Sequence, residues 1–264
     1  MDDKFLFKKS LGQNFLVDKN VIHKIVDNAK IDKDTLVIEV GPGSGAITEE
    51  IVPQSQYSLL YEIDGRLENL IKDKLIDCDN YSLIVKDFLK ANVKDELSKY
   101  KYSKLYVVAN LPYYITSPII MKFIDDDILP DRIIVMVQKE VAARLSAKKG
   151  TRDYGSLTVL LNYYYDITKL FDVSRYCFIP RPNVDSSVVC MELKKDRLSV
   201  KDVSFFKIFV RDCFAMKRKN LRNNLKNYDL VVINDILNKY GYSLDNRAEE
   251  LSLEVFIEVS NALS

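Results

Sequence analysis

Asn110, Leu111, Pro112 and Tyr113 form the segment of the sequence with the most specific chemistry. The Asn110 carboxamide oxygen and the Leu111 backbone carbonyl oxygen can each accept one hydrogen from an exocyclic adenine amine, while Pro112 holds the turn rigid. Accepting both hydrogens frees the nitrogen lone pair for attack on an electrophilic carbon. Tyr113 offers a flat face on which the extruded base can stack. These residues therefore favour a group transfer to an adenine nitrogen, which needs no general base.

A glycine-rich loop indicates where a nucleotide-like cofactor binds. Gly41 begins the sequence Gly-Pro-Gly-Ser-Gly directly after an apolar run, and Glu62 ends the next apolar run. Glu62 lies about 20 positions after Gly41, the offset at which an acidic residue accepts hydrogen bonds from ribose hydroxyls. The loop lacks the third glycine that carries a pyrophosphate in dinucleotide sites. The pattern therefore favours S-adenosylmethionine over a nicotinamide dinucleotide.

Two further side chains are candidates for this site. Asp87 follows a third apolar run, where its carboxylate can accept a hydrogen bond from the adenine amine of the cofactor. Phe178 precedes a loop that Pro180 and Pro182 stiffen, and its ring can cover the second face of the target base. Packing in the core is the alternative for Phe178.

The elements that hold these residues alternate between short β-branched runs and longer amphipathic segments. This alternation is typical of βαβ units around a parallel sheet. Tight turns or acidic residues follow the runs, which places the candidate residues at the carboxyl ends of the strands. We expect strands over residues 36–40, 58–63, 83–85, 105–109 and 133–137, and an antiparallel hairpin of 163–166 and 188–193 that closes the sheet.

The charge and the spacing of apolar residues in the sequence change after Leu193. A charged link leads into apolar residues at helical spacing, so we expect a catalytic domain over residues 1–193 and a small helical domain over 194–264. The net charge is +1, but residues 194–226 contain eleven Lys or Arg and three Asp. This imbalance is consistent with polyanion binding and equally with a solvated helical face.

Several classes of function are disfavoured by composition. His23 is the only histidine, and its helical context predicts an exposed position, which argues against histidine-dependent hydrolases and metalloenzymes. The four cysteines include no C-x-x-C pair, so we expect no metal. We see neither a signal peptide nor a run of membrane-spanning length, and we therefore expect a cytoplasmic protein without a membrane partner.

Taken together, these segments resemble the KsgA family of bacterial small-subunit rRNA adenine dimethyltransferases, nearly from end to end. The motifs that carry the resemblance span residues 11–16, 39–45, 110–114, 138–145, 178–182, 217–225 and 247–251. One departure is Lys217, where the family more often has arginine, so the charge is kept but bidentate phosphate geometry is lost.

The resemblance implies a Rossmann-like α/β fold of the class I S-adenosylmethionine methyltransferases, with a seven-stranded, mostly parallel sheet and a small C-terminal all-helical domain. It implies dimethylation of two adjacent adenosines in a hairpin loop near the 3′ end of small-subunit (16S) rRNA, by a monomer that acts late in ribosome assembly. The cofactor residues that it implies are Asn14, Leu16, Gly41, Glu62, Asp87 and Asn110. We expect RNA contacts from Lys8, Lys9, Lys201, Lys207, Arg211, Lys217, Arg218, Lys219 and Arg222.

Two alternatives remain open at this point. A sister family methylates one adenine of large-subunit (23S) rRNA and confers macrolide resistance, and it shares the Asn-x-Pro-Tyr site. That family usually has isoleucine at the position of Leu111, and the motifs of residues 217–225 and 247–251 match the small-subunit family better. The other alternative is a protein that serves mainly as an RNA-binding checkpoint of ribosome assembly, with methylation secondary.

Overall fold

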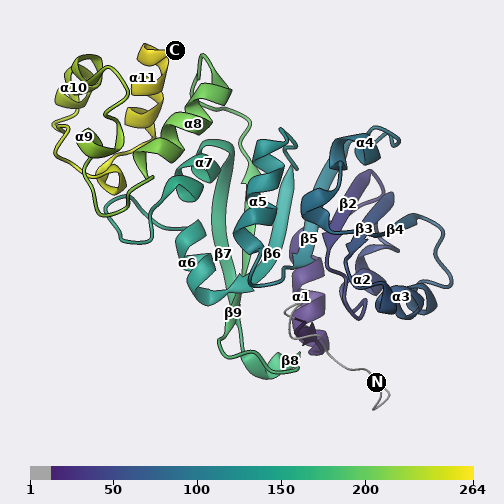
Figure 1. Ribbon diagram of the computed structural model, residues 1–264. Helices are drawn as coiled ribbons and strands as arrows, with labels where there is room; N and C mark the ends of the chain where they lie inside the picture. The colour runs from purple at the N-terminus through teal and green to yellow at the C-terminus, as the bar shows by residue number, and fades with distance from the viewer. Residues whose placement is uncertain (1–12) are drawn as a thin grey trace. The chain divides into compact units, whose positions relative to one another are not determined.

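The computed structural model describes residues 13–264, and its central feature is a seven-stranded sheet (Figure 1). The strands follow one another in space in the order β4 (Tyr81–Val85), β3 (Tyr57–Glu62), β2 (Thr35–Val40), β5 (Lys104–Asn110), β6 (Arg132–Gln138), β9 (Ser186–Leu193) and β7 (Tyr165–Val173). The first five run parallel, and β9 runs antiparallel to β6. The predicted mostly parallel, seven-stranded sheet is confirmed.

The parallel strands form where the sequence has uninterrupted apolar runs. Every residue of β2 is buried, as are the central residues of β3, β5 and β6. A parallel strand that is covered on both faces needs such a run rather than an alternating pattern. β2 lies between β3 and β5, so the segment that leads into the glycine loop occupies the centre of the sheet.

Short helices connect these strands. Asp18 begins the first of them, because its side chain accepts hydrogen bonds from the backbone N–H groups of Asn20 and Val21. This helix buries one apolar face and packs against β5 and β6. The helices and 3-10 turns of this part are α1 (Lys19–Ala29), α2 (Thr48–Ile51), η2 (Gly65–Leu67), α3 (Glu68–Lys74), η3 (Phe88–Lys90), α4 (Val93–Leu97), α5 (Thr116–Asp125) and η4 (Arg175–Cys177).

One prediction about strands needs correction, and one short ribbon was not predicted. Residues 163–166 do not form a strand of their own, because α7 (Ser156–Tyr164) runs up to Tyr164 and β7 starts at Tyr165. Tyr163 and Tyr164 are buried together with Val159 and Leu160, and this helical packing outweighs the β propensity of tyrosine. The sequence analysis also missed a two-stranded antiparallel ribbon made of β1 (Phe15–Leu16) and β8 (Phe178–Ile179).

Contacts between Cα atoms divide the chain into two compact units. Of the described residues, the first contains 13–142 and 168–193, and the second contains 143–167 and 194–264. Residues 143–167, which we expected in the catalytic domain, thus group with the C-terminal helices, because α7 packs against two of them, α8 and α11. The division into domains at residue 193 stays a prediction.

The second unit is helical beyond residue 194, as expected. Phe206, Phe209 and Phe256 are buried in its core, where α8 packs on α7 and α11 packs on α10. Its helices are α8 (Val203–Cys213), α9 (Leu221–Asn224), α10 (Leu230–Lys239), η5 (Ala248–Glu250) and α11 (Leu253–Leu263), while α6 (Lys139–Leu145) spans the first division between the units. Over residues 13–264, no helix has both the length and the apolar character that crossing a membrane requires.

Candidate active site

A cleft opens at the carboxyl ends of β2, β3, β4 and β5, the edge of a doubly wound sheet at which ligands bind. Its empty volume, which includes space open to solvent, is about 910 Å³. All of its lining belongs to the first unit. The candidate residues that line it are Asn14, Leu16, Gly41, Glu62, Asp87, Asn110, Leu111, Pro112 and Tyr113.

The glycine loop has a backbone conformation that favours glycine. Gly41 and Gly43 have φ angles of +74° and +59°, in the left-handed region. A Cβ atom on Gly43 would lie 3.1 Å from two ring carbons of Phe15, whose side chain also lines the cleft. The glycines therefore let the main chain form a wall of the cleft directly against β1.

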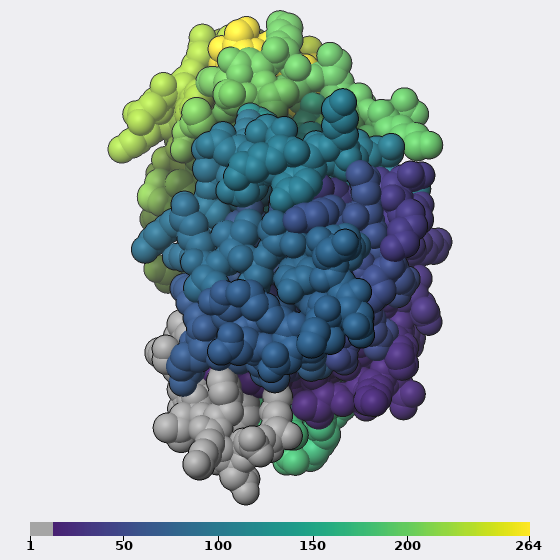
Figure 2. Space-filling view, turned by 90° about the vertical axis from the view of Figure 1, so that its right-hand side faces the viewer, coloured from purple at the N-terminus to yellow at the C-terminus, as the bar shows by residue number. Residues whose placement is uncertain are grey.

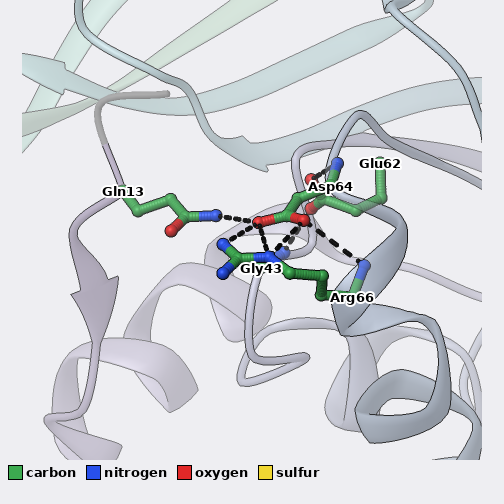
Figure 3. Close-up of polar contacts among 5 residues, drawn as sticks. All are labelled: Gln13, Gly43, Glu62, Asp64 and Arg66. Atoms are coloured by element: carbon green, nitrogen blue, oxygen red, sulfur yellow. Dashed lines mark hydrogen bonds and ion pairs between the residues drawn. The ribbon is translucent and has the colours of Figure 1, made fainter. Parts of the chain in front are cut away.

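Glu62 fixes this loop to the end of β3. Its Oε2 accepts a hydrogen bond from the Gly43 backbone N–H at 3.0 Å, and its Oε1 accepts one from the Asp64 backbone N–H at 2.8 Å (Figure 3). Burial raises the pKa of this carboxyl group, whereas the two backbone donors lower it. Each carboxylate oxygen has a second lone pair, so Glu62 can hold the loop and still accept a hydrogen bond from a ribose hydroxyl.

Asp64 ties the N-terminal side of the cleft to the same strand end. Its Oδ2 accepts a hydrogen bond from Gln13 Nε2 at 2.8 Å, and the Arg66 guanidinium donates to Oδ1 at 2.9 Å and to Oδ2 at 2.6 Å (Figure 3). Arg66 holds the pKa of Asp64 well below its usual range. Gln13 and Asp64 were not predicted as site residues, and the only signal for them was their proximity in sequence to Asn14 and Glu62.

Asn110 lies at the end of β5 with its carboxamide oriented by the chain itself. Its Nδ2 donates a hydrogen bond to the Asn14 backbone oxygen at 3.1 Å. The amide nitrogen is thus engaged as a donor, and the Oδ1 atom is the end of the carboxamide that can accept a hydrogen from an amine. Leu111 is buried, and its N–H donates to the Met136 carbonyl oxygen at 3.1 Å, which fixes the Asn110–Leu111 peptide.

Two tyrosines follow on the same wall. The Tyr113 hydroxyl forms a 2.7 Å hydrogen bond with the buried Ser186 Oγ at the start of β9, so its ring has a fixed position. Tyr114 also lines the cleft, and it is 54% exposed. Burial raises the pKa of both phenols, which therefore stay neutral at physiological pH.

Asp87 and Phe88 form the floor at the end of β4. Asp87 Oδ1 accepts the Leu89 backbone N–H at 3.0 Å, and this bond starts η3 and fixes the carboxylate. Phe88 is buried edge-to-face against Tyr61, with ring centroids 5.1 Å apart, and it also lines the cleft.

Phe178, which we expected beside the target base, lies in the β1–β8 ribbon. It pairs with Leu16 in the β1–β8 ribbon, is 3% exposed, and belongs to the hydrophobic core of the first unit. Phe178 is not one of the described residues that line the cleft. Core packing, the alternative considered for this residue, matches this position, and the role of its ring in covering the target base stays a prediction.

Glu39, near the end of β2, makes the stability of the folded protein depend on pH. Thr48 Oγ1 donates to Glu39 Oε2 at 2.7 Å, but burial dominates and raises the pKa of Glu39 from 4.5 to about 8. The folded protein therefore binds one more proton than the unfolded chain between these values, and its free energy of unfolding falls as pH rises from 4.5 to 8.

We predict that Glu39→Gln removes this decrease, because glutamine does not titrate. Urea unfolding of both proteins at several pH values from 5 to 8 measures the effect, and the variant should gain stability relative to wild type as pH rises. Parallel pH dependences of the two proteins would show that Glu39 does not hold the extra proton.

The basic residues of the second unit are not all available for binding. Lys217, Arg218, Lys219 and Arg222 are exposed. Lys207, expected to contact RNA, is instead buried at 7% exposure among the apolar residues of α8, because its long aliphatic stem can pack there. Lys8 and Lys9 lie outside the described residues. No group of three or more His, Cys, Asp or Glu within residues 13–264 could hold a metal ion.

The sheet, the glycine loop after β2 and the carboxylate at the end of β3 define a class I S-adenosylmethionine-dependent methyltransferase. Two solved structures share this architecture over nearly the whole chain. A dimethyladenosine transferase from Plasmodium falciparum is 26% identical with a TM-score of 0.75, covering 93% of this chain and 95% of that one. The 23S rRNA methyltransferase ErmE is 26% identical with a TM-score of 0.70, covering 95% and 99%.

Residues 4–264 match the family model described as ribosomal RNA adenine dimethylase, and the chain belongs to this family. A relative named ribosomal RNA small subunit methyltransferase A, from Bacillus cytotoxicus, is 43% identical over 98% of this chain and 92% of its own length. One of the same name from Bacillus mycoides is 42% identical over the same shares. The protein is therefore an S-adenosylmethionine-dependent rRNA adenine methyltransferase.

Proposed function

We propose that this enzyme dimethylates the exocyclic N6 amines of two adjacent adenosines in a hairpin loop near the 3′ end of small-subunit (16S) rRNA. The relatives from the two Bacillus species support the small subunit as the source of the RNA. The observation that carries the proposal is the Asn110 carboxamide, which the Asn14 carbonyl oxygen orients at the edge of the cleft.

In this proposal, Glu62 binds the ribose of the cofactor, Asp87 its adenine, and Gly41 lies under its methionine part, with Asn14 and Leu16 forming the opposite wall. Bound S-adenosylmethionine supplies a methyl group on a positively charged sulfur, which is already a good leaving group. The cleft fits this cofactor, because it combines exposed main chain at Gly41 with a buried carboxylate and apolar walls.

The remaining chemistry falls to the target side of the cleft. Asn110 Oδ1 and the Leu111 carbonyl oxygen accept the two hydrogens of the adenine amine, so that its lone pair points away from the ring system. Tyr113 stacks on the base and holds it at the cleft. These residues act by position and electrostatics, and no side chain has to remove a proton before the transfer.

The substrate in this proposal is an assembling small ribosomal subunit in the cytoplasm, and the enzyme acts as a monomer. The test is incubation with labelled S-adenosylmethionine and undermethylated small subunits, followed by mapping of the methylated positions. Two adjacent dimethylated adenosines in a hairpin loop near the 3′ end are the expected result. Label confined to large-subunit RNA would favour the function of ErmE, the 23S rRNA methyltransferase with the same fold.

A primarily structural role as an assembly checkpoint makes a different prediction. If cells that carry Asn110→Ala mature their small subunits as well as wild type while the bound variant leaves the rRNA unmethylated, binding is the main role. The anchored Asn110 and the intact cleft instead support a catalytic role.

We predict that the exposed basic residues between α8 and α9 contribute to RNA affinity. Reversing the charge of Lys217, Arg218 and Lys219 together should weaken binding to small-subunit rRNA and flatten its salt dependence, because each lost phosphate contact lowers the slope of log K against log salt by about 0.7–0.9. Filter binding over a range of salt concentrations measures this slope. Lys101→Glu, an exposed charge reversal before the amino end of β5, is the control, and equal slopes for wild type and triple variant would refute the contact.

A further inference from the structure

An exposed aromatic residue between two arginines lies outside the cleft, on the loop between β7 and β9. Tyr176 is 63% exposed. The Arg181 guanidinium carbon lies 4.1 Å from the centroid of its ring, and that of Arg175 lies 5.6 Å from the same centroid. We call Arg175, Tyr176 and Arg181 the Tyr176 platform. Neither the fold nor the methyl transfer described above uses it.

The loop holds the platform in a defined shape. The Arg175 backbone N–H donates to Asp185 Oδ1 at 3.0 Å, and its guanidinium donates to the Asn183 carbonyl oxygen at 3.2 Å. The Ser174 hydroxyl caps η4 by accepting the Tyr176 backbone N–H at 3.3 Å. An exposed ring that is braced in this way loses little conformational freedom when a flat partner binds to it.

The platform is connected to the wall of the cleft. Directly after it, Phe178 and Ile179 form β8, which pairs with Phe15 and Leu16 of β1, and both of these β1 residues line the cleft. The Val17 backbone N–H donates to the Cys177 carbonyl oxygen at 2.9 Å and extends this connection. In Figure 2 the green atoms of this segment emerge at the lower edge, next to the purple atoms of the first elements.

The chemistry of the platform matches an unpaired RNA base. Proteins that bind single-stranded RNA stack bases on tyrosine rings and on guanidinium planes, and arginine adds attraction to the phosphate backbone. A strand of RNA that delivers one adenosine into the cleft must continue past its rim, where further unpaired nucleotides need support. Arg175 and Arg181 bring two positive charges to the loop that adjoins β8, the strand paired with β1 of the cleft wall, while Asp185 accepts the Arg175 N–H.

We propose that the Tyr176 platform stacks on the base of an unpaired nucleotide that flanks the target adenosines. This inference rests on the proposed function, because it requires an RNA loop as the substrate. Tyr176 and Arg181 are positioning residues: they hold the loop, and they do not touch the reacting nitrogen.

The test compares Tyr176→Ala with Tyr176→Phe on undermethylated small subunits. Tyr176→Ala should raise KM for the subunits by about 5- to 100-fold, the equivalent of ~1–3 kcal/mol for one base stacked on an aromatic ring. The kcat at saturating subunits and the calorimetric Kd for S-adenosylmethionine should stay within about twofold of wild type. Tyr176→Phe keeps the ring and should behave like wild type.

A second readout separates stacking from a structural role. Nucleotide-resolution chemical probing of the bound loop should show one flanking base protected by wild type and Tyr176→Phe but reactive with Tyr176→Ala. Arg181→Ala should also raise KM and flatten the salt dependence of binding, whereas Arg181→Lys should restore the salt dependence.

Three results would overturn the inference. The first is an unchanged KM and unchanged protection with Tyr176→Ala. The second is a parallel loss of cofactor affinity, which would show that Tyr176 acts only by supporting the β1–β8 ribbon. The third is a wild-type enzyme that leaves small subunits unmethylated, in which case the proposed function fails first and this inference fails with it.

Discussion

Asn110→Ala should lower kcat for methyl transfer by about 100- to 1,000-fold, the usual effect of removing one preorganised hydrogen-bonding group from an active site. Asn110 Oδ1 is the acceptor for the target amine, and its Nδ2 is anchored on the Asn14 carbonyl oxygen at 3.1 Å. Single-turnover methyl transfer to undermethylated small subunits measures the rate of the chemical step. Calorimetry with S-adenosylmethionine shows separately how much cofactor binding the variant retains.

Asn110→Asp tests the role of the carboxamide more specifically than Asn110→Ala does. It preserves the shape of the side chain, but it places a carboxylate oxygen against the Asn14 carbonyl oxygen, so acceptor faces acceptor. We expect a loss of rate comparable to that of Asn110→Ala. Asn28→Ala, which removes a carboxamide from α1, is the matched control and should keep the wild-type rate. A wild-type rate for Asn110→Ala would exclude the proposed role of the carboxamide.

Glu62→Gln should weaken binding of S-adenosylmethionine by about 10- to 100-fold, because hydrogen bonds to charged groups contribute ~1.5–3 kcal/mol each. In wild type, both carboxylate oxygens accept backbone N–H groups, from Gly43 at 3.0 Å and from Asp64 at 2.8 Å. The amide of glutamine can satisfy only one of these donors and turns its own N–H groups toward the other. The variant therefore keeps one acceptor oxygen instead of two, loses the charge that strengthens the bond to the ribose, and leaves one of the two backbone N–H groups that shape the loop without its acceptor.

Calorimetry measures this affinity, and urea unfolding without cofactor measures how much of the loss comes from the loop. Glu68→Gln makes the same chemical change at an exposed carboxylate on α3 and should leave the affinity unchanged. If Glu62→Gln binds the cofactor as tightly as wild type, the carboxylate does not contact the ribose and serves only to hold Gly43.

Much of the fold could be predicted because the parallel strands are encoded locally. A strand buried on both faces needs a continuous apolar run, and such runs are visible at β2, β3, β5 and β6 without any knowledge of tertiary contacts. Gly41, Glu62 and Asn110 follow or end such runs, and Asp87 follows the half-buried strand β4, so predicting the strands also predicted that these residues line one cleft.

The missed features depend on contacts between distant segments. The β1–β8 ribbon has only two residues in each strand, too few to give a pattern in the sequence, yet it decides that Phe178 faces the core. The bond from Gln13 to Asp64 likewise joins segments that are far apart in the chain. Charge was also an incomplete guide, because Lys207 counts as a cation in the sequence but has its side chain packed within α8.

The close approach of Gly43 to the ring of Phe15 has a consequence for how members of such a lineage can diverge. A methyl group at position 43 would have to share space with an aromatic ring 3.1 Å away, and the positive φ angle adds strain to every L-residue placed there. We therefore expect a substitution at position 43 to require a compensating substitution at position 15. The glycine loop is thereby coupled to β1, a strand outside the seven-stranded sheet.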